Sequence, residues 1–161
     1  MGNLLFSPNG RINSGEFMKG AVILVIIGVI LSLPGTFGMK GIGTALGVLS
    51  YLLAFPWVVI WIKRYHDGGK SGWMCLVPLI VYAVLLMVVM AALLGGEFSQ
   101  MIELASSGAS QAEQESFAEG MMKGKEIPFT LAGAATSLVV AFLFNSMIKR
   151  DDHENQFGPA S

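Results

Sequence analysis

Charged residues are scarce in this sequence. Of its 161 residues only 13% are charged, whereas 53% are hydrophobic, and the mean hydropathy is +0.64. In a typical soluble domain about a quarter of the residues are charged. The ten lysines and arginines are scattered and the net charge is −1, so the chain lacks the local basic excess that a phosphate backbone requires. These shortages indicate a membrane protein with no nucleic-acid partner.

Residue spacings typical of metal and catalytic sites are also missing. Cys75 is the single cysteine, which excludes an intrachain disulfide and a multi-cysteine metal site. His66, Asp67 and the acidic run 151–154 are of a kind that binds metals, but no HExxH-like spacing is present. The stretch around Ser71 is neither a nucleophile elbow nor a Walker-type phosphate loop. We therefore predict no metal and no cofactor, and we do not favour an enzyme.

Long apolar runs take the place of these features. Four runs without charge cover residues of about 17–37, 42–62, 73–94 and 128–148. The hydrocarbon core of a bilayer is about 30 Å thick and requires roughly 20 apolar residues in a helix. The runs lack the alternation of barrel strands. The sequence thus predicts an all-α fold, an integral membrane four-helix bundle in a single domain over residues 1–161. The first run exceeds a signal-peptide h-region and no A-x-A-like site follows it, so we expect it to be retained.

The distribution of basic residues predicts the orientation of the bundle. Cytoplasmic ends of membrane helices carry an excess of lysine and arginine. Seven basic residues fall on one side of the predicted spans and three on the other: Arg11, Lys19, Lys63, Arg64, Lys70, Lys149 and Arg150, against Lys40, Lys123 and Lys125. Both termini and the 63–72 loop are therefore expected in the cytoplasm. The acidic loop 95–127 then faces outward, either as two short apolar-striped segments or as a flexible loop.

The stretch "RYHDGGKSGW", residues 64–73, is unusual between two apolar runs. Its glycines permit a tight turn, Ser71 can cap the third helix, and Trp73 suits the membrane interface. Lys63 and Arg64 can extend toward lipid headgroups. A turn with interfacial anchors explains all of these residues, but it does not require the pair His66 and Asp67.

Three motifs resemble one bacterial membrane-protein family. "FSPNGRI", "RYHDGGKSGW" and "NQFGP" are similar to the signature blocks of the family called domain of unknown function 805, across essentially the whole chain. The first block departs from the family pattern, because Ser14 stands where a second arginine is usual and Met18 where a tryptophan is usual. The resemblance implies a small multi-span protein of the bacterial inner membrane, with no established molecular activity.

The predicted orientation brings all three motifs to the cytoplasmic face, where we expect them to meet. We expect Asp67 to pair with Arg11 or Arg64, Asn155 to bond loop carbonyls, and Phe157 to pack on Trp73. The candidate binding or structural cluster consists of Gly10, Arg11, Arg64, His66, Asp67, Gly69, Ser71, Gly72, Trp73, Asn155, Phe157 and Gly158.

Two classes of function fit this sequence. A binding or scaffold module would use the structured cytoplasmic face to bind membrane lipids, a small ligand, a protein partner or a second copy of the chain. The alternative is a subunit of a small transporter or pore. Such proteins usually have ionisable groups inside their spans, and the central thirds of the four runs have none. Gly43 and Gly47 permit close helix packing, within the bundle or between copies.

Overall fold

The computed structural model describes residues 2–161 and contains four helical segments long and apolar enough to cross a membrane. The first is helix α2 (Ser14–Thr36). The second, Gly41–Asp67, consists of α3 (Lys40–Ser50), the 3₁₀ turn η1 (Tyr51–Leu53) and α4 (Ala54–Asp67). The third joins the 3₁₀ turn η2 (Gly72–Cys75) to α5 (Leu76–Leu94), and the fourth is α8 (Glu126–Met147). The prediction of an all-α protein with four long apolar helices is confirmed.

Apolar side chains cover the outside of these helices. Ile30, Val84 and Phe142, for example, are all more than half exposed. In water such a surface would drive aggregation, whereas lipid chains solvate it and leave the internally bonded helix backbone undisturbed. The chain is therefore a multi-pass membrane protein.

Proline explains the irregular starts of two helices. Pro56 lies in the first turn of α4, directly after η1, and Pro78 lies at the same position of α5, after η2. A proline has no N–H and its ring obstructs the carbonyl four residues earlier. The backbone therefore changes from a 3₁₀ to an α-helical pattern just before each proline.

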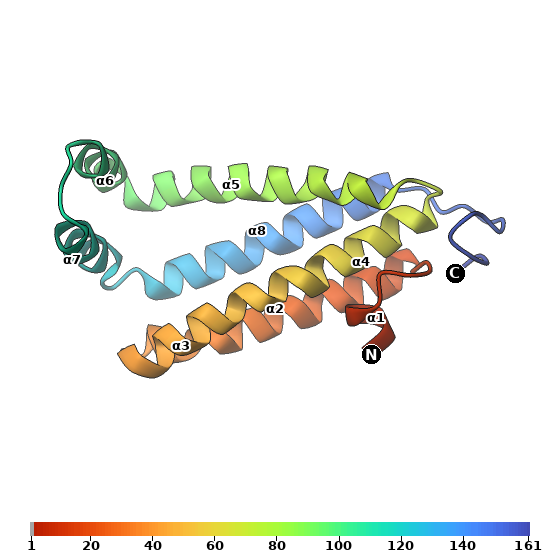
Figure 1. Cartoon of the computed structure of the whole chain (residues 1–161), viewed down its shortest axis with the longest axis horizontal. Coiled ribbons are helices and arrows are strands. Elements are labelled where there is room, and N and C mark those ends of the chain that lie inside the picture. Colours follow the sequence, from red (N-terminus) through yellow and green to blue (C-terminus); the bar gives the residue numbers. More distant parts are fainter. Residues whose placement is uncertain (1) are drawn as a thin grey trace.

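The helices pack in an open arrangement. α2 lies against α3, α4 and α8, while α5 lies against α8. Figure 1 shows α4 and α5 diverging from the turn that joins them. α2 and α3 approach each other closely, because a Cβ added to Gly43 would lie 2.7 Å from the Cα of Gly35. Gly43 thus permits close packing within the bundle, whereas an added Cβ at Gly47 meets no atom within 4 Å.

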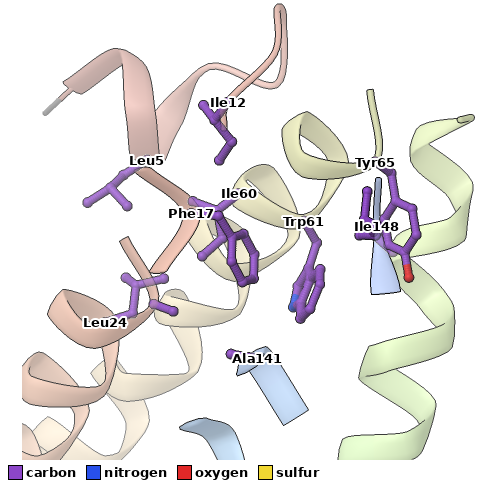
Figure 2. Close-up of a cluster of buried hydrophobic side chains, with 11 residues drawn as sticks. Leu5, Ile12, Phe17, Leu24, Ile60, Trp61, Tyr65, Ala141 and Ile148 are labelled. Atoms are coloured by element: carbon purple, nitrogen blue, oxygen red, sulfur yellow. The ribbon is translucent and has the colours of Figure 1, made fainter. Parts of the chain in front are cut away.

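Aromatic side chains form the core at one end of the bundle (Figure 2). Phe17 of α2 and Trp61 of α4 have ring centroids 4.4 Å apart. Phe144 of α8 meets the same indole edge-on at 6.3 Å, and Tyr65 lies 6.0 Å from it. This cluster fixes α2, α4 and α8 relative to one another.

The segment between α5 and α8 is helical. It forms α6 (Gly96–Ser106) and α7 (Gln111–Met122), which pack on each other at the end of the bundle away from the termini (Figure 1). Ser110 and Glu113 form a capping box at the start of α7, and Lys125 forms an ion pair with Glu97. The hydrogen bonds from Ser110 lower the pKa of the Glu113 carboxyl.

Both described ends of the chain lie at the opposite end of the bundle (Figure 1). We call this end, formed by residues 2–13, 63–73 and 148–161, the terminal face. The predicted loop at 63–72 is too long, because α4 continues past Ile62 to Asp67 and the actual turn is 68–71. The charged side chains of the last α4 turn find buried partners, so they do not require a solvated loop.

Candidate functional site

Asp67 is the centre of the terminal face. Its side chain is fully buried and contacts two arginines from different parts of the chain. Arg11 Nη2 lies 3.3 Å from Asp67 Oδ1, and Arg64 Nη1 lies 2.8 Å from Oδ2. We call these three residues the Asp67 clasp. The expectation that Asp67 pairs with Arg11 or Arg64 understates the geometry, because it pairs with both.

Arg64 connects the clasp to α8. Its Nε donates to Asn145 Oδ1 at 2.6 Å, and its Nη2 donates to the backbone carbonyls of Asn145 and Ile148 at 3.2 and 2.5 Å. Asn145 in turn donates through Nδ2 to Ser14 Oγ at 2.8 Å. A planar guanidinium with several fixed donors suits such a junction, which a lysine would not reproduce.

Arg11 connects the clasp to the C-terminal tail. Its Nη1 donates to the carbonyl of His153 at 2.7 Å and to that of Gly158 at 3.3 Å, and its Nη2 donates to the carbonyl of Asp151. The Asp151 amide donates to the Asp67 carbonyl at 2.8 Å. Arg11 therefore fastens the tail through backbone carbonyls, which every residue type provides.

Glycines allow the α4–α5 turn to approach the tail closely. Gly69 has a positive φ of 66°, which favours glycine. A Cβ added to Gly68 would lie 2.8 Å from Ile148 Cγ2, and one added to Gly72 would lie 2.9 Å from Ile62 Cγ2. Ser71 accepts a hydrogen bond from the Trp73 amide and so caps η2, as expected.

His66 and Phe157 form the outer layer of the site. Their rings stack at 3.7 Å with an interplanar angle of 4°. The His66 Nδ1 lies 3.3 Å from the Gly10 carbonyl, which is within hydrogen-bond distance of that acceptor. The expected contact between Phe157 and Trp73 is wrong, because Trp73 is 79% exposed at the surface. Its position suits an interfacial anchor.

Asn155 orders the tail beneath this stack. Its Nδ2 donates to the His66 carbonyl and to Asp151 Oδ2, each at 3.2 Å. The first bond is the expected contact with a loop carbonyl. The second is the largest cause that lowers the pKa of the Asp151 carboxyl, with a smaller contribution from the His153 amide.

The contacts on the terminal face bring together ten of the twelve predicted cluster residues, while Ser71 and Trp73 contact each other at its rim. Further residues take part that the prediction omitted, among them Gly68, Asn145, Asp151 and Ser161, whose hydroxyl donates to Asp67 Oδ1. The sequence does contain an indication of the role of Asn145, because an amide side chain is unusual near the end of an apolar run. It contains no indication of the role of Ser161.

The clasp has little capacity to bind a ligand directly. Each buried side-chain nitrogen and oxygen in residues 2–161 has a hydrogen-bond partner, which leaves the arginines fully used by the protein itself. The same residues contain no group of three or more His, Cys, Asp and Glu side chains placed to hold a metal ion. The arrangement therefore holds the terminal face together.

A separate cavity lies inside the bundle, on the membrane side of this face. Its volume is about 520 Å³, and residues from α2, α4, α5 and α8 line it, together with the η1 turn. Ser32, Ser137 and Tyr82 are among the polar side chains on a mainly apolar wall. Within the described part of the chain, no Asp, Glu, Lys, Arg or His lines this cavity.

Comparison with known proteins agrees with the motifs that meet at the terminal face. Neither the curated proteins nor the solved structures contain a match to this chain. One family matches, over residues 5–159, so that the match includes Arg11, Arg64, Asp67 and Asn155. The chain therefore belongs to the DUF805 family, described as proteins of unknown function.

Proposed function

We propose that this protein is a binding or scaffold module of the bacterial cytoplasmic membrane, which presents the terminal face to the cytoplasm. One observation carries the proposal. Residues 10–11, 64–72 and 155–158, far apart in the sequence, are held against one buried ion cluster. The ion cluster forms only when these segments are positioned together. The segments therefore form a surface of fixed shape.

The rim of the terminal face supports a binding role. Lys70, Lys149 and Arg150 are exposed around the clasp, and Trp73 projects beside them. Exposed basic groups at a membrane surface attract anionic headgroups or acidic segments of a partner. The excess of basic residues at this end supports the cytoplasmic orientation.

Cysteine labelling tests the orientation. In a Cys75→Ala background, single cysteines would replace Ser71 in the α4–α5 turn and Ser107 between α6 and α7, both of which are exposed. A membrane-impermeant maleimide should label position 107 in intact cells and position 71 only after lysis. Labelling of position 71 in intact cells would reverse the orientation and remove the cytoplasmic assignment.

Native mass spectrometry tests the binding role. The full-length protein, extracted gently from its own membranes, should retain an anionic lipid or a protein partner. A Lys70→Glu/Lys149→Glu variant should lose that species, while Lys123→Glu, an exposed change at the other end of the bundle, should keep it. Retention by both variants would show that the terminal face does not bind it.

A transporter or pore subunit is the alternative function. It requires a polar path through the helices. The cavity inside the bundle is mainly apolar, and its described lining lacks charged residues. Such a lining favours the binding of an apolar ligand over the passage of ions or charged solutes.

A further inference from the structure

The cavity inside the bundle has the size of a ligand site. Its 520 Å³ falls within the roughly 300–1,000 Å³ of typical small-molecule pockets. An apolar cavity of about 150 Å³ is already large enough for benzene. Val58 of α4 and Leu79 of α5 are among the residues that line it. These two helices diverge from the turn that joins them (Figure 1). The lipid around the bundle is therefore the nearest source of an apolar occupant.

Trp61 supplies an N–H donor to this mainly apolar space. Its side chain lines the cavity and only 2% of the residue is exposed. Among residues 2–161 the Trp61 indole N–H has no hydrogen-bond partner. Every fully enclosed side-chain nitrogen of these residues does have a partner, so the indole nitrogen is not fully enclosed. The open space that the Trp61 side chain borders is the cavity. A buried tryptophan N–H normally has an acceptor.

The indole is held in a fixed orientation. Phe17 packs on its ring at 4.4 Å (Figure 2), and Phe144 meets it edge-on at 6.3 Å. The hydroxyls of Ser32 and Ser137 donate to the carbonyls of Val29 and Gly133, and neither of them accepts a hydrogen bond from the indole. Trp61 is thus a positioned donor without an acceptor, in a cavity that an apolar chain would fill.

The depth of Trp61 identifies the acceptor. It precedes Asp67 by six residues on α4, which places it about 9 Å further into the membrane at 1.5 Å per residue. The polar layer on each side of a bilayer is roughly 5–8 Å thick, from the difference between the full and the hydrocarbon thickness. If the terminal face lies in that layer, Trp61 lies at its lower boundary. The ester carbonyls of phospholipids are found at this boundary.

We propose that the cavity binds one acyl chain of a membrane phospholipid, which enters between α4 and α5, and that Trp61 donates a hydrogen bond to the ester carbonyl of that chain. This inference does not rest on the proposed function of the terminal face. The binding is non-covalent, and the ligand class is an acyl ester with its headgroup outside the cavity.

Competition between two lipids tests the hydrogen bond. The full-length protein in detergent would be mixed with equal amounts of dioleoyl phosphatidylglycerol and its diether analogue, which lacks the ester carbonyls. Native mass spectrometry should show the diester retained about three- to ten-fold over the diether, the ratio that one neutral hydrogen bond gives. Trp61→Phe should abolish the preference, and Trp73→Phe, a change at the exposed rim, should keep it.

Filling the cavity tests its occupation independently of Trp61. Gly133 lines the cavity and a Cβ added there meets no atom within 4 Å, so Gly133→Leu extends into open space. This variant should lose most of its retained diester lipid. Gly47→Leu is the matched control, because Gly47 also has open space but does not line the cavity.

The proposal would be overturned by any of these results: no diester preference in the wild type, a preference that survives Trp61→Phe, or equal lipid retention by Gly133→Leu and Gly47→Leu. Trp61-dependent retention of an isoprenoid quinone in place of phospholipid would also overturn it. If only the Lys70→Glu/Lys149→Glu variant loses its bound lipid or partner, the result bears on the terminal face and not on the cavity.

Discussion

Replacing Asp67 by asparagine tests whether the clasp holds the terminal face together. The substitution keeps the shape of the side chain but removes the one negative charge between Arg11 and Arg64. Two guanidinium groups would then remain buried without a counter-ion, and the amide nitrogen of Asn would face donors. The tail would lose support at the same time, because the hydroxyl of Ser161 donates to this carboxylate.

The expected loss of stability is large. Asp67 is 0% exposed, and removing one partner of a buried ion pair typically costs about 3–5 kcal/mol. For a chain of this size 1 kcal/mol corresponds to roughly 2–4 °C in Tm. We therefore expect Asp67→Asn to lower the Tm by about 6–20 °C.

Two measurements on the full-length protein check this expectation. Thermal unfolding in detergent or nanodiscs gives the change in Tm, and limited trypsin digestion reports on the tail through cleavage after Lys149. Asp152→Asn is the matched control, since the Asp152 side chain is 83% exposed and its partner Arg150 is also exposed. Exposed pairs contribute roughly 0–1 kcal/mol, so this variant should match the wild type in both assays.

Equal and negligible effects of Asp67→Asn and Asp152→Asn would refute the reasoning. The turn would then be held by its glycines and backbone bonds alone. A lower Tm without faster cleavage after Lys149 would show that the clasp stabilises the helices but does not fasten the tail.

Two other predictions follow from the contacts. Gly43→Ala should destabilise the bundle, because its Cβ would collide with the Gly35 backbone, whereas Gly47→Ala on the same helix should be neutral or slightly stabilising; thermal unfolding of both variants distinguishes these effects. Asn155→Ala should raise the pKa of Asp151 toward its ordinary value of 3.8, as followed by NMR titration. Because the folded pKa is lowered, ionised Asp151 stabilises the folded tail above its ordinary pKa, and this contribution disappears as the pH falls through the lowered pKa.

The long helices could be predicted from sequence because lipid imposes a simple rule of length and apolarity. The end of α4 could not. Lys63 and Arg64 follow an apolar run and therefore resemble the start of a loop, yet Lys63 donates to the Asn3 carbonyl at 2.7 Å and Arg64 bonds α8. These partners lie some sixty and eighty residues away, respectively. The charges are satisfied by tertiary contacts that local sequence does not reveal.

The candidate site was predictable in composition and less so in geometry. The motifs and the shared orientation of their segments indicated that Arg11, Asp67 and Asn155 would meet. The partner of Phe157 was predicted incorrectly, because the choice between His66 and Trp73 depends on the path of the tail. That path is set by backbone carbonyls bonded to Arg11, and any residue type has a carbonyl. The cavity had no sequence signal, since it results from the divergence of α4 and α5.

The polar and aromatic layers at the terminal end of the bundle are structurally connected. They draw one residue each from the same three helices: Ser14, Arg64 and Asn145 in the polar layer, and Phe17, Trp61 and Phe144 in the aromatic one. On α2 and α4 the two layers are three residues apart, which is about one helical turn. The bonds of the clasp therefore fix the rotation of the helices that orient the Trp61 indole.

If the layers are coupled, Asp67→Asn should weaken the preference for the diester lipid as well as lowering the Tm, and by linkage the bound lipid should slow cleavage of the tail. An unchanged lipid preference in an Asp67→Asn protein of lowered Tm would show that the aromatic packing alone orients Trp61.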